Sequence, residues 1–468
     1  MKQIIRHPVA VIGAGPVGLA AAAHLALRSE PFLVLEAGPS VGHAMAQWAH
    51  VRVFSPWRFN IDRAARQLLE AADWQAPDPE AMPTGGELLA RYLKPLAAHP
   101  ALARGIRLNT RVSAVTRQGM DKVKSTGREE RPFALRLSDG ETLLARAVID
   151  ASGTWFQPNP IGADGLPVPG EAEQAAHIAY GIPDVLGHER ARYAGKRVLV
   201  IGSGHSAFNV LLDLAALPDT RVHWAMRRSE PGNVFGGGAN DALPARGALG
   251  AEARRAVQSG RVELLAPFRV QAIKPGLTVE AEHDGEDIAL SVDEIVVATG
   301  FRPDLAMNRE VRVTADPWLE AVPALAPLID PNLHSCGTVR PHGAKELAQP
   351  EADYYVLGMK SYGRAPTFLM ATGYEQARSV VAALVGDHAA AARVELELPQ
   401  TGVCTGPAIT LLAVESAAAG CCGGPAPAEA DACCVADATA KAAGADGCGC
   451  GPAEPAKAPA TAAKGCCG

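Results

Sequence analysis

The chain has 468 residues, which is too long for one ordinary domain and indicates two or three. Its composition, with 48% hydrophobic and 20% charged residues, is normal for a globular protein, and a net charge of −6 argues against nucleic acid as a partner. The chain starts in a strand-like pattern, which argues against a secretory leader. Three glycines and a proline interrupt the apolar stretch 9–27, which argues against a membrane span.

Strand-like runs alternate with Ala- and Leu-rich helical stretches up to about residue 398. This alternation predicts a parallel α/β architecture. The segment 85–100 has apolar residues at helical spacing, and the charged segment 120–131 is expected to be a hairpin or surface loop. The strand-like runs are "PVAVIG", "FLVLEA", "RVLVIG" and "EIVVATG".

The first motif is "VAVIGAGPVGLAAAAHL", in which a strand is followed by Gly13, Gly15 and Gly18 in GxGxxG spacing and then by a helix. This pattern binds a dinucleotide, because the glycines permit a tight turn, close approach of the diphosphate and close helix packing. The next strand ends at Glu36, 23 residues after Gly13. A carboxylate there accepts hydrogen bonds from a ribose and repels a 2′-phosphate, so the motif predicts FAD or NAD and not NADP.

The second motif, "RVLVIGSGHSAFNVLLDL", has Gly202, Gly204 and Ala207 in GxGxxA spacing. Its following strand ends not in an acid but in Arg227 and Arg228, 25 and 26 residues after Gly202. Guanidinium groups in this place match a 2′-phosphate, which favours NADPH over NADH. The alternative is that both arginines only solvate the end of a strand.

Two dinucleotide motifs in one chain, one marked by an acid and one by arginines, resemble flavoproteins with two dinucleotide-binding domains. These include flavin-containing monooxygenases and thioredoxin-reductase-like enzymes. The resemblance covers about residues 1–398 and includes "VIDASGTW" and "VVATGFRPD", which look like strand ends that meet a cofactor. It implies FAD and NADPH as cofactors, with a Rossmann-like NADPH domain (166–322) inserted between two parts of a Rossmann-like FAD domain (1–165 and 323–400). A tail (401–468) follows, and "YYVLGMKSYGRAPTFLMATGYEQARSVVAAL" would supply the last strand and a helix facing the flavin.

The resemblance also implies which residues contact each cofactor. For FAD they are Gly13, Ala14, Gly15, Pro16, Gly18, Glu36, Ala37, Trp48, Val112, Ser152 and Gly153. For NADP they are Gly202, Ser203, Gly204, His205, Ser206, Ala207, Arg227, Arg228, Thr299 and Gly300.

Reduced flavin passes electrons to a disulfide, to another acceptor or to oxygen. A disulfide reductase needs a cysteine pair beside the flavin, and neither "SVGHAMAQWAHVRVF" nor residues 169–323 contain a cysteine. The stretch "WAHVRVFSPWRFNID" resembles the segment along the flavin of the monooxygenases. It implies Asn60 as the catalytic donor to a flavin hydroperoxide, with Trp48 and Trp57 as pocket walls. The alternatives are a turn residue for Asn60 and core packing for the tryptophans.

One part of the pattern departs from the monooxygenases, whose fingerprint has the form FxGxxxHxxx(aromatic). In "LPVPGEAEQAAHIAY" six residues instead of three separate Gly170 from His177, and the leading Phe is missing. His177 and Tyr180 keep only the end of the fingerprint, and a surface or interface role for His177 is an equal alternative.

The last fifty residues carry thiols in pairs on an Ala-, Gly- and Pro-rich background, which predicts a disordered tail. Only Cys336 and Cys404 precede them, which argues against a secreted disulfide framework and for a cytoplasmic protein. Adjacent thiols form strained disulfides but bind soft thiophilic ions well. The candidate metal ligands are Cys421, Cys422, Cys433, Cys434, Cys448, Cys450, Cys466 and Cys467.

The "TGVC" and "AAGCCGGPA" segments are similar to the ends of flavoproteins encoded in bacterial arsenic-resistance operons. We therefore expect an NADPH- and FAD-dependent monooxygenase that uses oxygen on a small soft nucleophile, with trivalent arsenic as a candidate substrate gathered by the tail. Three alternatives stay open. One is an NADPH-driven reductase of a disulfide or thiol-bound metal or metalloid that uses tail dithiols. Another is a metalloid-binding protein with a vestigial flavin domain, and the third is a tail that stores zinc or copper or has no role.

Overall fold

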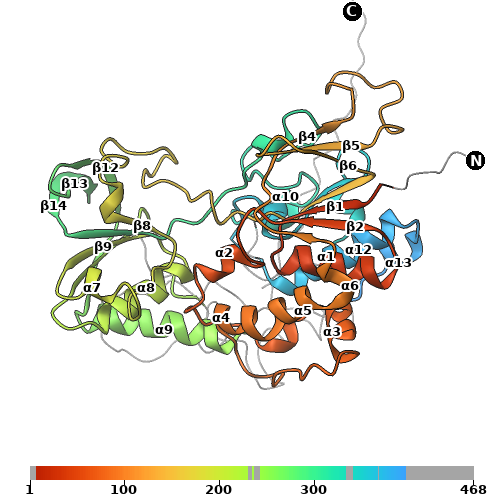
Figure 1. Cartoon of the computed structure of the whole chain (residues 1–468). Coiled ribbons are helices and arrows are strands. Elements are labelled where there is room, and N and C mark those ends of the chain that lie inside the picture. Colours follow the sequence, from red (N-terminus) through yellow and green to blue (C-terminus); the bar gives the residue numbers. More distant parts are fainter. Residues whose placement is uncertain (1–6, 230–233, 237–242, 334–340, 367, 397–468) are drawn as a thin grey trace, which may run out of the picture. The chain divides into compact units, whose positions relative to one another are not determined.

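The computed structural model describes residues 7–229, 234–236, 243–333, 341–366 and 368–396 (Figure 1). The chain divides into two units, Met1–Ile409 and Thr410–Gly468, and all described residues belong to the first. The predicted tail, including its eight candidate metal-ligating cysteines, lies outside the described residues. Among the residues that are described, no helix is long and apolar enough to cross a bilayer.

The first layer of the fold is a five-stranded parallel sheet with the strand order β16-β7-β1-β2-β3. All four residues of β1 and of β7 are buried, as expected for a parallel sheet covered on both faces. The strands are β1 (Val9–Ile12), β2 (Phe32–Leu35), β3 (Ile106–Arg107), β7 (Ala147–Asp150) and β16 (Tyr354–Val356).

Helices α1 and α12 pack against each other, and α1 also packs on α3 and α6 (Figure 1). Helix α1 is rich in alanine and buried along nearly its whole length, because it lies between β1, β2 and α12. The helices of this part are α1 (Pro16–Leu27), α2 (His43–Ala46), η1 (Trp57–Phe59), α3 (Arg63–Glu70), α4 (Gly85–Leu88), η2 (Leu89–Leu93), α5 (Lys94–Ala98), α6 (Pro100–Ala103), η6 (Ala306–Asn308), α10 (Ala326–Ile329), α11 (Ala344–Leu347), η7 (Gly358–Tyr362), α12 (Met370–Leu384) and α13 (His388–Ala392).

A second parallel sheet, of order β11-β10-β9-β15-β8, contains the strand of the second glycine motif. Its elements are η3 (Ala175–His177), β8 (Ile178–Tyr180), α7 (Arg190–Tyr193), β9 (Arg197–Ile201), α8 (His205–Ala215), β10 (Arg221–Ala225), α9 (Pro244–Gln258), β11 (Val262–Leu265) and β15 (Glu294–Val297). Two such sheets confirm the predicted α/β class with two Rossmann-like domains. The strands of the first sheet flank those of the second in the chain, since β7 precedes β8 and β16 follows β15.

Each parallel sheet is accompanied by a three-stranded antiparallel sheet. One consists of β4 (Val112–Arg117), β5 (Phe133–Leu137) and β6 (Thr142–Ala145), and its inward residues share a hydrophobic core with β1 and β7. The other consists of β12 (Phe268–Lys274), β13 (Thr278–His283) and β14 (Glu286–Ser291).

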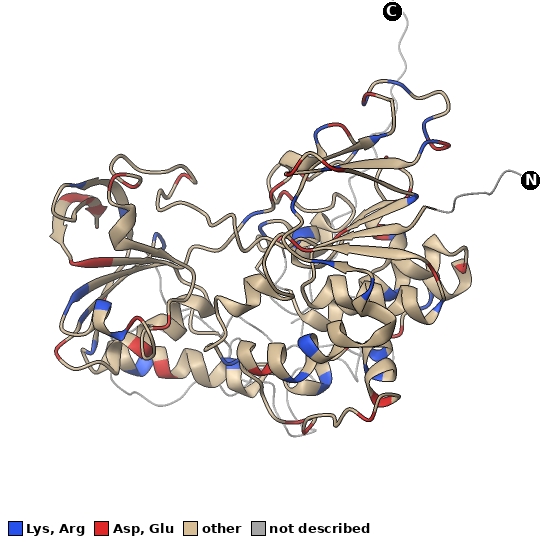
Figure 2. Ribbon diagram, in the orientation of Figure 1, with Lys and Arg blue, Asp and Glu red and all other residues tan. Residues whose placement is uncertain are grey.

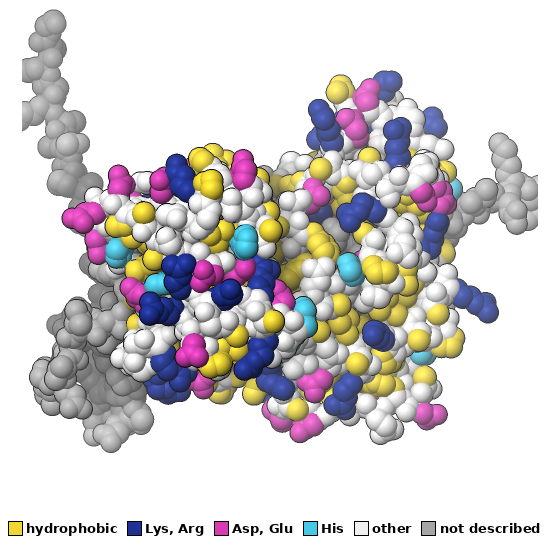
Figure 3. Space-filling view, turned by 60° about the vertical axis from the view of Figure 1, so that its left-hand side comes forward, with side chains coloured by type: hydrophobic (Ala, Val, Ile, Leu, Met, Phe, Trp, Pro, Cys, Tyr) yellow, Lys and Arg dark blue, Asp and Glu magenta, His cyan; other side chains and the backbone are white. Residues whose placement is uncertain are grey.

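Charged residues of both signs lie near one another along the described chain (Figure 2) and on the face drawn in Figure 3. Several form ion pairs across neighbouring strands, as Arg197 does with Asp293 at 2.9 Å and Arg269 with Glu282 at 2.6 Å. Exposed pairs of this kind contribute little stability each. The mild net charge is therefore distributed and locally balanced over the described residues.

The charged segment 120–131, predicted as a surface loop, joins β4 to β5, but it is anchored by a buried cation. Arg128 is 3% exposed and donates to both carboxylate oxygens of Glu351. Arg117, 1% exposed, donates to the same carboxylate at 2.8 Å and stacks over Phe133. One buried carboxylate thus neutralises two buried guanidinium groups and ties the loop to the segment before β16.

Glu351→Gln is expected to lower the free energy of unfolding by about 3 kcal/mol, because two buried cations lose their counter-charge. Burial alone would raise the pKa of Glu351, but hydrogen bonds from Arg128 and Arg117 outweigh it and hold the pKa below 4.5. The stabilisation is therefore present above about pH 4.5 and is lost as the pH falls through the lowered pKa. Urea unfolding at several pH values measures both effects. Glu141→Gln, which breaks the exposed Arg107–Glu141 pair, is the control and should leave the midpoint unmoved. An equal shift in both variants would contradict the prediction.

Candidate functional site

The first glycine loop has the geometry that its sequence predicts. Gly13 has φ +98°, and a Cβ there would lie 2.8 Å from the Ala151 carbonyl oxygen. A Cβ on Gly18 would lie 2.0 Å from the Gly13 carbonyl oxygen, so α1 packs on the loop through a bare glycine. A Cβ on Gly15 would meet nothing within 4 Å, so open space faces this residue. The loop is therefore tight on its protein side and open on the side where a diphosphate would lie.

Helix α1 starts directly at this opening. Gly15 is its N-cap and makes no side-chain cap, and Pro16 at the first position has no N–H to satisfy. The remaining N–H groups of the first turn and the positive end of the helix dipole are available to an anion.

Glu36 closes the other side of the loop. It is 9% exposed, and its two carboxylate oxygens accept the backbone N–H groups of Ala14 and Gly38, each at 2.8 Å. Each oxygen keeps lone pairs for further donors, such as the hydroxyls of a ribose. The residue thereby fastens the glycine loop to the end of β2 and faces the space beside it, which fits the adenosine half of a dinucleotide.

The remaining residues predicted to contact FAD differ in their positions in the structure. Ser152 and Gly153 lie beside the glycine loop, since the Cβ built on Gly13 would be 3.0 Å from Ser152 Cα. Ala37 is exposed at the end of β2, and Trp48 is partly buried. Val112 is 8% exposed and its side chain packs in the hydrophobic core, and its contact with FAD stays a prediction.

The second glycine loop repeats the first. Gly202 has φ +134°, and its Cβ would lie 2.3 Å from the Ala298 carbonyl oxygen, whereas Gly204, the N-cap of α8, faces open space. Ala207 is fully buried. Ser203 and Ser206 are partly buried in the same loop and first turn, and the His205 ring lies 5.5 Å from that of Phe54. This loop is likewise open where a diphosphate would lie.

Arg227 and Arg228 follow β10 after the buried Met226, and both are exposed. Arg227 Nη1 donates to the Ala163 carbonyl oxygen at 3.3 Å. The place is the carboxyl end of the strand after the loop, where the ribose of a second dinucleotide would lie. Exposure leaves both guanidinium groups accessible to a phosphate.

Thr299 and Gly300 lie in a segment that is hydrogen-bonded to the segment around Asn159. The Asn159 side-chain amide donates to the Thr299 carbonyl oxygen, and the Thr299 hydroxyl donates to the Asn159 carbonyl oxygen. The backbone N–H of Asn159 donates to the Gly300 carbonyl oxygen at 2.9 Å. Asn159 Oδ1 also accepts from Arg302 Nε at 3.0 Å. Segments 155–160 and 299–302 therefore run side by side, and part of the polar capacity of the two residues is used there.

Asn60 is held inside its own turn. Its side-chain N–H groups donate to the carbonyl oxygens of Ser55 (2.7 Å) and Pro56 (3.0 Å), and its Oδ1 accepts from Ser55 Oγ. The residue is 1% exposed, and Trp57 beside it is 2% exposed and lies in the core. Both side-chain hydrogens of Asn60 are thus occupied in this conformation. A catalytic role would need the turn to rearrange, and that role stays a prediction.

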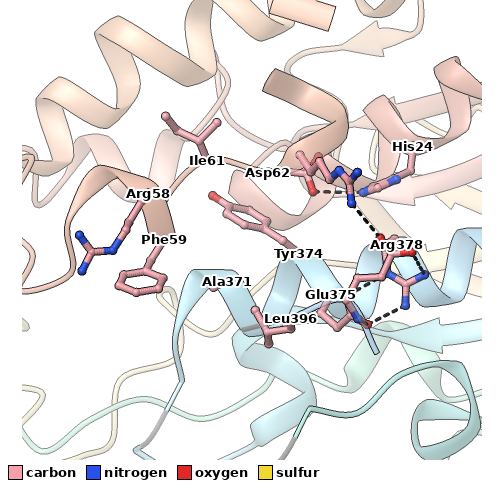
Figure 4. A pocket seen from close by; sticks show the side chains of 12 residues that line it. His24, Arg58, Phe59, Ile61, Asp62, Ala371, Tyr374, Glu375, Arg378 and Leu396 are labelled. Atoms are coloured by element: carbon pink, nitrogen blue, oxygen red, sulfur yellow. Dashed lines mark hydrogen bonds and ion pairs between the residues drawn. The ribbon is translucent and has the colours of Figure 1, made fainter. Parts of the chain in front are cut away.

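A cavity of about 320 Å³ opens beside this turn (Figure 4). Phe59 and Ile61, the neighbours of Asn60, line it together with Tyr374, which donates to the Asn60 carbonyl oxygen at 2.9 Å. Burial raises the pKa of Tyr374 well above its usual range, so the phenol stays neutral and acts as a donor. The charged lining is paired, as in the His24–Asp62 contact of 3.1 Å and the Arg378–Glu375 contact of 2.6 Å.

The segment that departs from the monooxygenase fingerprint has a local structural explanation. Gly170 has φ +86°, and a Cβ there would lie 1.8 Å from the Ile273 carbonyl oxygen, so β12 passes directly over it. His177 pairs with Glu294 at 3.1 Å, and Tyr180 donates to Glu171 at 2.5 Å. The structure therefore shows contacts of these residues within the second sheet and its loops.

The sequence did not single out two buried charges at the first site. Asp150 ends β7 and Lys360 lies in η7, with 2.7 Å between the Asp150 carboxylate and the Lys360 ammonium group. An acid as the last residue of β7 and a lysine in the turn after β16 were the available signal. Their pairing was not predictable, since 210 positions separate them in the chain.

Comparison with known proteins defines the class. The family model described as pyridine nucleotide-disulphide oxidoreductase matches residues 10–326. The ferredoxin–NADP reductase of Thermus thermophilus is 25% identical over 303 residues, 63% of this chain and 72% of that protein. The indole-3-pyruvate monooxygenase YUCCA1 of rice is 30% identical over 206 residues, 44% of each chain. The bacillithiol disulfide reductase Bdr of Bacillus cereus shares the fold, with a TM-score of 0.61 at 19% identity, covering 81% of this chain and 99% of that one.

The chain therefore belongs to the pyridine nucleotide-disulphide oxidoreductase family. It is an oxidoreductase that uses FAD and a nicotinamide nucleotide, as the two loops indicate. The Gly13 loop and Glu36 fit FAD, and the Gly202 loop with its arginines fits NADP(H). FAD held by the Gly13 loop and Glu36 would supply a hydride acceptor for a nicotinamide nucleotide held by the Gly202 loop.

Proposed function

We propose that this protein is an NADPH- and FAD-dependent monooxygenase that oxidises a small soft nucleophile, with trivalent arsenic as the candidate substrate. One observation carries the proposal: residues 1–335, which include both glycine loops, contain no cysteine. The body of the chain thus offers no dithiol beside either loop, and oxygen needs none. The matches to monooxygenases support the same choice.

The residues proposed to hold the cofactors are those at the two loops, namely Glu36, the Gly13 and Gly202 turns, and Arg227 with Arg228. Asn60 is proposed as a donor to the reacting oxygen once its turn opens. The tail thiols, which lie outside the described residues, are proposed to gather trivalent arsenic, because thiolates bind soft ions. The balanced reaction is arsenite + O₂ + NADPH + H⁺ → arsenate + NADP⁺ + H₂O.

The test is NADPH oxidation in air with increasing arsenite, followed by mass analysis of arsenate formed under ¹⁸O₂. We expect arsenite to stimulate NADPH consumption, with one ¹⁸O atom in each arsenate. Hydrogen peroxide as the only product, with arsenite and with sulfide or amine substrates alike, would overturn the proposal. A chain that ends at Gln400 is the matched variant: it should keep NADPH oxidation and need more arsenite for half-stimulation.

The second candidate is an NADPH-dependent reductase of a disulfide or thiol-bound metalloid, favoured by the four thiol pairs of the tail. Oxygen distinguishes the two. A reductase would oxidise NADPH under argon with a disulfide or thiol-bound metalloid as acceptor, whereas a monooxygenase would require oxygen. The reductase activity should also be lost in the chain that ends at Gln400.

A further inference from the structure

Asp150, Ser152 and Lys360 form a polar group at the carboxyl ends of β7 and β16, and Tyr354 of β16 also interacts with Asp150. Asp150 is fully buried and Lys360 is 2% exposed, while Ser152 is exposed. Lys360 Nζ lies 2.7 Å from Asp150 Oδ2 and donates to Ser152 Oγ at 3.0 Å. Ser152 Oγ in turn lies 2.7 Å from Asp150 Oδ1. The ion pair is thus buried, and its hydroxyl partner is exposed.

The direction of these hydrogen bonds is determined by chemistry. An ammonium group has no acceptor, so Ser152 Oγ must accept from Lys360. An ionised carboxylate has no donor, so Ser152 must give its one proton to Asp150. One lone pair remains on the exposed hydroxyl. Ser152 therefore offers an acceptor and not a donor, which suits a hydroxyl group and not a phosphate oxygen.

The sheet order shows which part of FAD reaches Ser152. A dinucleotide crosses a parallel sheet outside the carboxyl ends of its strands, at the point where the strand order reverses. In the order β16-β7-β1-β2-β3, Glu36 marks the adenosine side at β2, and the Gly13 loop after β1 takes the diphosphate. The other half of a bound FAD would then lie at the carboxyl ends of β7 and β16. Gly358 of the same η7 turn lies against Val17 in the first turn of α1, so the segments converge there.

We propose that Ser152 accepts a hydrogen bond from a ribityl hydroxyl of FAD, and that Asp150 and Lys360 are positioning residues that hold its lone pair toward this chain of hydroxyls. Lys360 also cancels the Asp150 charge next to the diphosphate. The proposal concerns FAD binding alone and does not depend on the acceptor of the electrons.

The test uses the full-length holoprotein and two ligands. FAD dissociation is followed by the fluorescence of released flavin, and ADP, which has the adenosine and diphosphate but no ribityl chain, is used to displace FAD. For Ser152→Ala we expect the Kd for FAD to rise about five- to tenfold, the effect of one hydrogen bond. The ADP concentration for half-displacement should fall by the same factor, because ADP binding is unchanged.

The role of the ion pair is tested in the double variant Asp150→Asn/Lys360→Met, which removes both charges together. It should weaken FAD binding, and adding Ser152→Ala to it should change the Kd by less than about twofold, because the pair acts through Ser152. Arg117→Met, which removes a buried cation elsewhere, should lower thermal stability and leave the FAD Kd unchanged.

Two results would overturn the proposal. An unchanged FAD Kd in Ser152→Ala would make the group a structural pair only. The other is a raised FAD Kd with no change in the ADP concentration that displaces half of the FAD. ADP binding would then have weakened equally, which would place Ser152 at the diphosphate instead.

Discussion

Replacing Gly18 with alanine is expected to give a colourless protein that no longer retains FAD. The added Cβ would lie 2.0 Å from the Gly13 carbonyl oxygen, far inside van der Waals contact, and both neighbours are backbone. Relief requires α1 to move away from the loop, although α1 is held by α12 and α3. The free N–H groups at the start of α1 would then be too far from the diphosphate to bind it. We expect the FAD Kd to rise at least about 100-fold, or about 3 kcal/mol.

Flavin content after purification and the Kd for added FAD measure this effect, and circular dichroism shows whether the fold persists. Gly204→Ala is the matched control, because it alters the second loop where a Cβ meets nothing. It should leave FAD binding unchanged while weakening NADPH. A yellow Gly18→Ala protein of normal affinity would show that α1 is not held against the loop as described.

Arg227→Ser/Arg228→Ser is expected to reverse the choice of nicotinamide nucleotide. Both side chains are exposed at the carboxyl end of β10, so their loss should not disturb packing. Each charge-assisted hydrogen bond to a 2′-phosphate contributes about 1.5–3 kcal/mol. We expect the KM for NADPH to rise about 100-fold or more, with the KM for NADH nearly unchanged.

Steady-state flavin reduction with each nucleotide measures this preference. Arg221→Ser is the control, since Arg221 is an exposed arginine at the amino end of the same strand. It should change neither KM. If the double variant kept its ratio of NADPH to NADH efficiency, the two arginines would only solvate the strand end.

The sequence predicted the glycine loops well because their constraints are local. A turn at φ +98° beside a passing carbonyl requires glycine whatever surrounds it, and the strand and helix on either side are adjacent in the chain. The same holds for Glu36, which binds backbone N–H groups of the loop directly beside its strand.

Residues whose role depends on distant neighbours were less predictable. The segment around Asn60 predicts a catalytic donor, which stays a prediction, but it did not indicate that the side chain donates to Ser55 and Pro56. Val112 stays a predicted FAD contact, and only the structure showed that its side chain packs in the core. The segment 120–131 was expected to be a hairpin or surface loop and does join β4 to β5, but the pairing of its Arg128 with Glu351, 223 positions away, was not predicted. Side-chain direction and long-range pairing decide these cases, and neither is encoded in spacing.

By itself the sequence determined the parallel α/β class and the two dinucleotide loops. It also determined that an acid, Glu36, follows the first loop and that two arginines, Arg227 and Arg228, follow the second. Hydrophobic periodicity and glycine spacing are short-range constraints, so they can be recognised without the fold. Tertiary structure alone decided which charges share a site. The return of β16 to the edge of β7 brings Lys360 onto Asp150 and Ser152, and only that strand pairing places an ammonium group at the first loop. The physical reason is that a buried charge needs a partner, and the fold, not the chain order, supplies it.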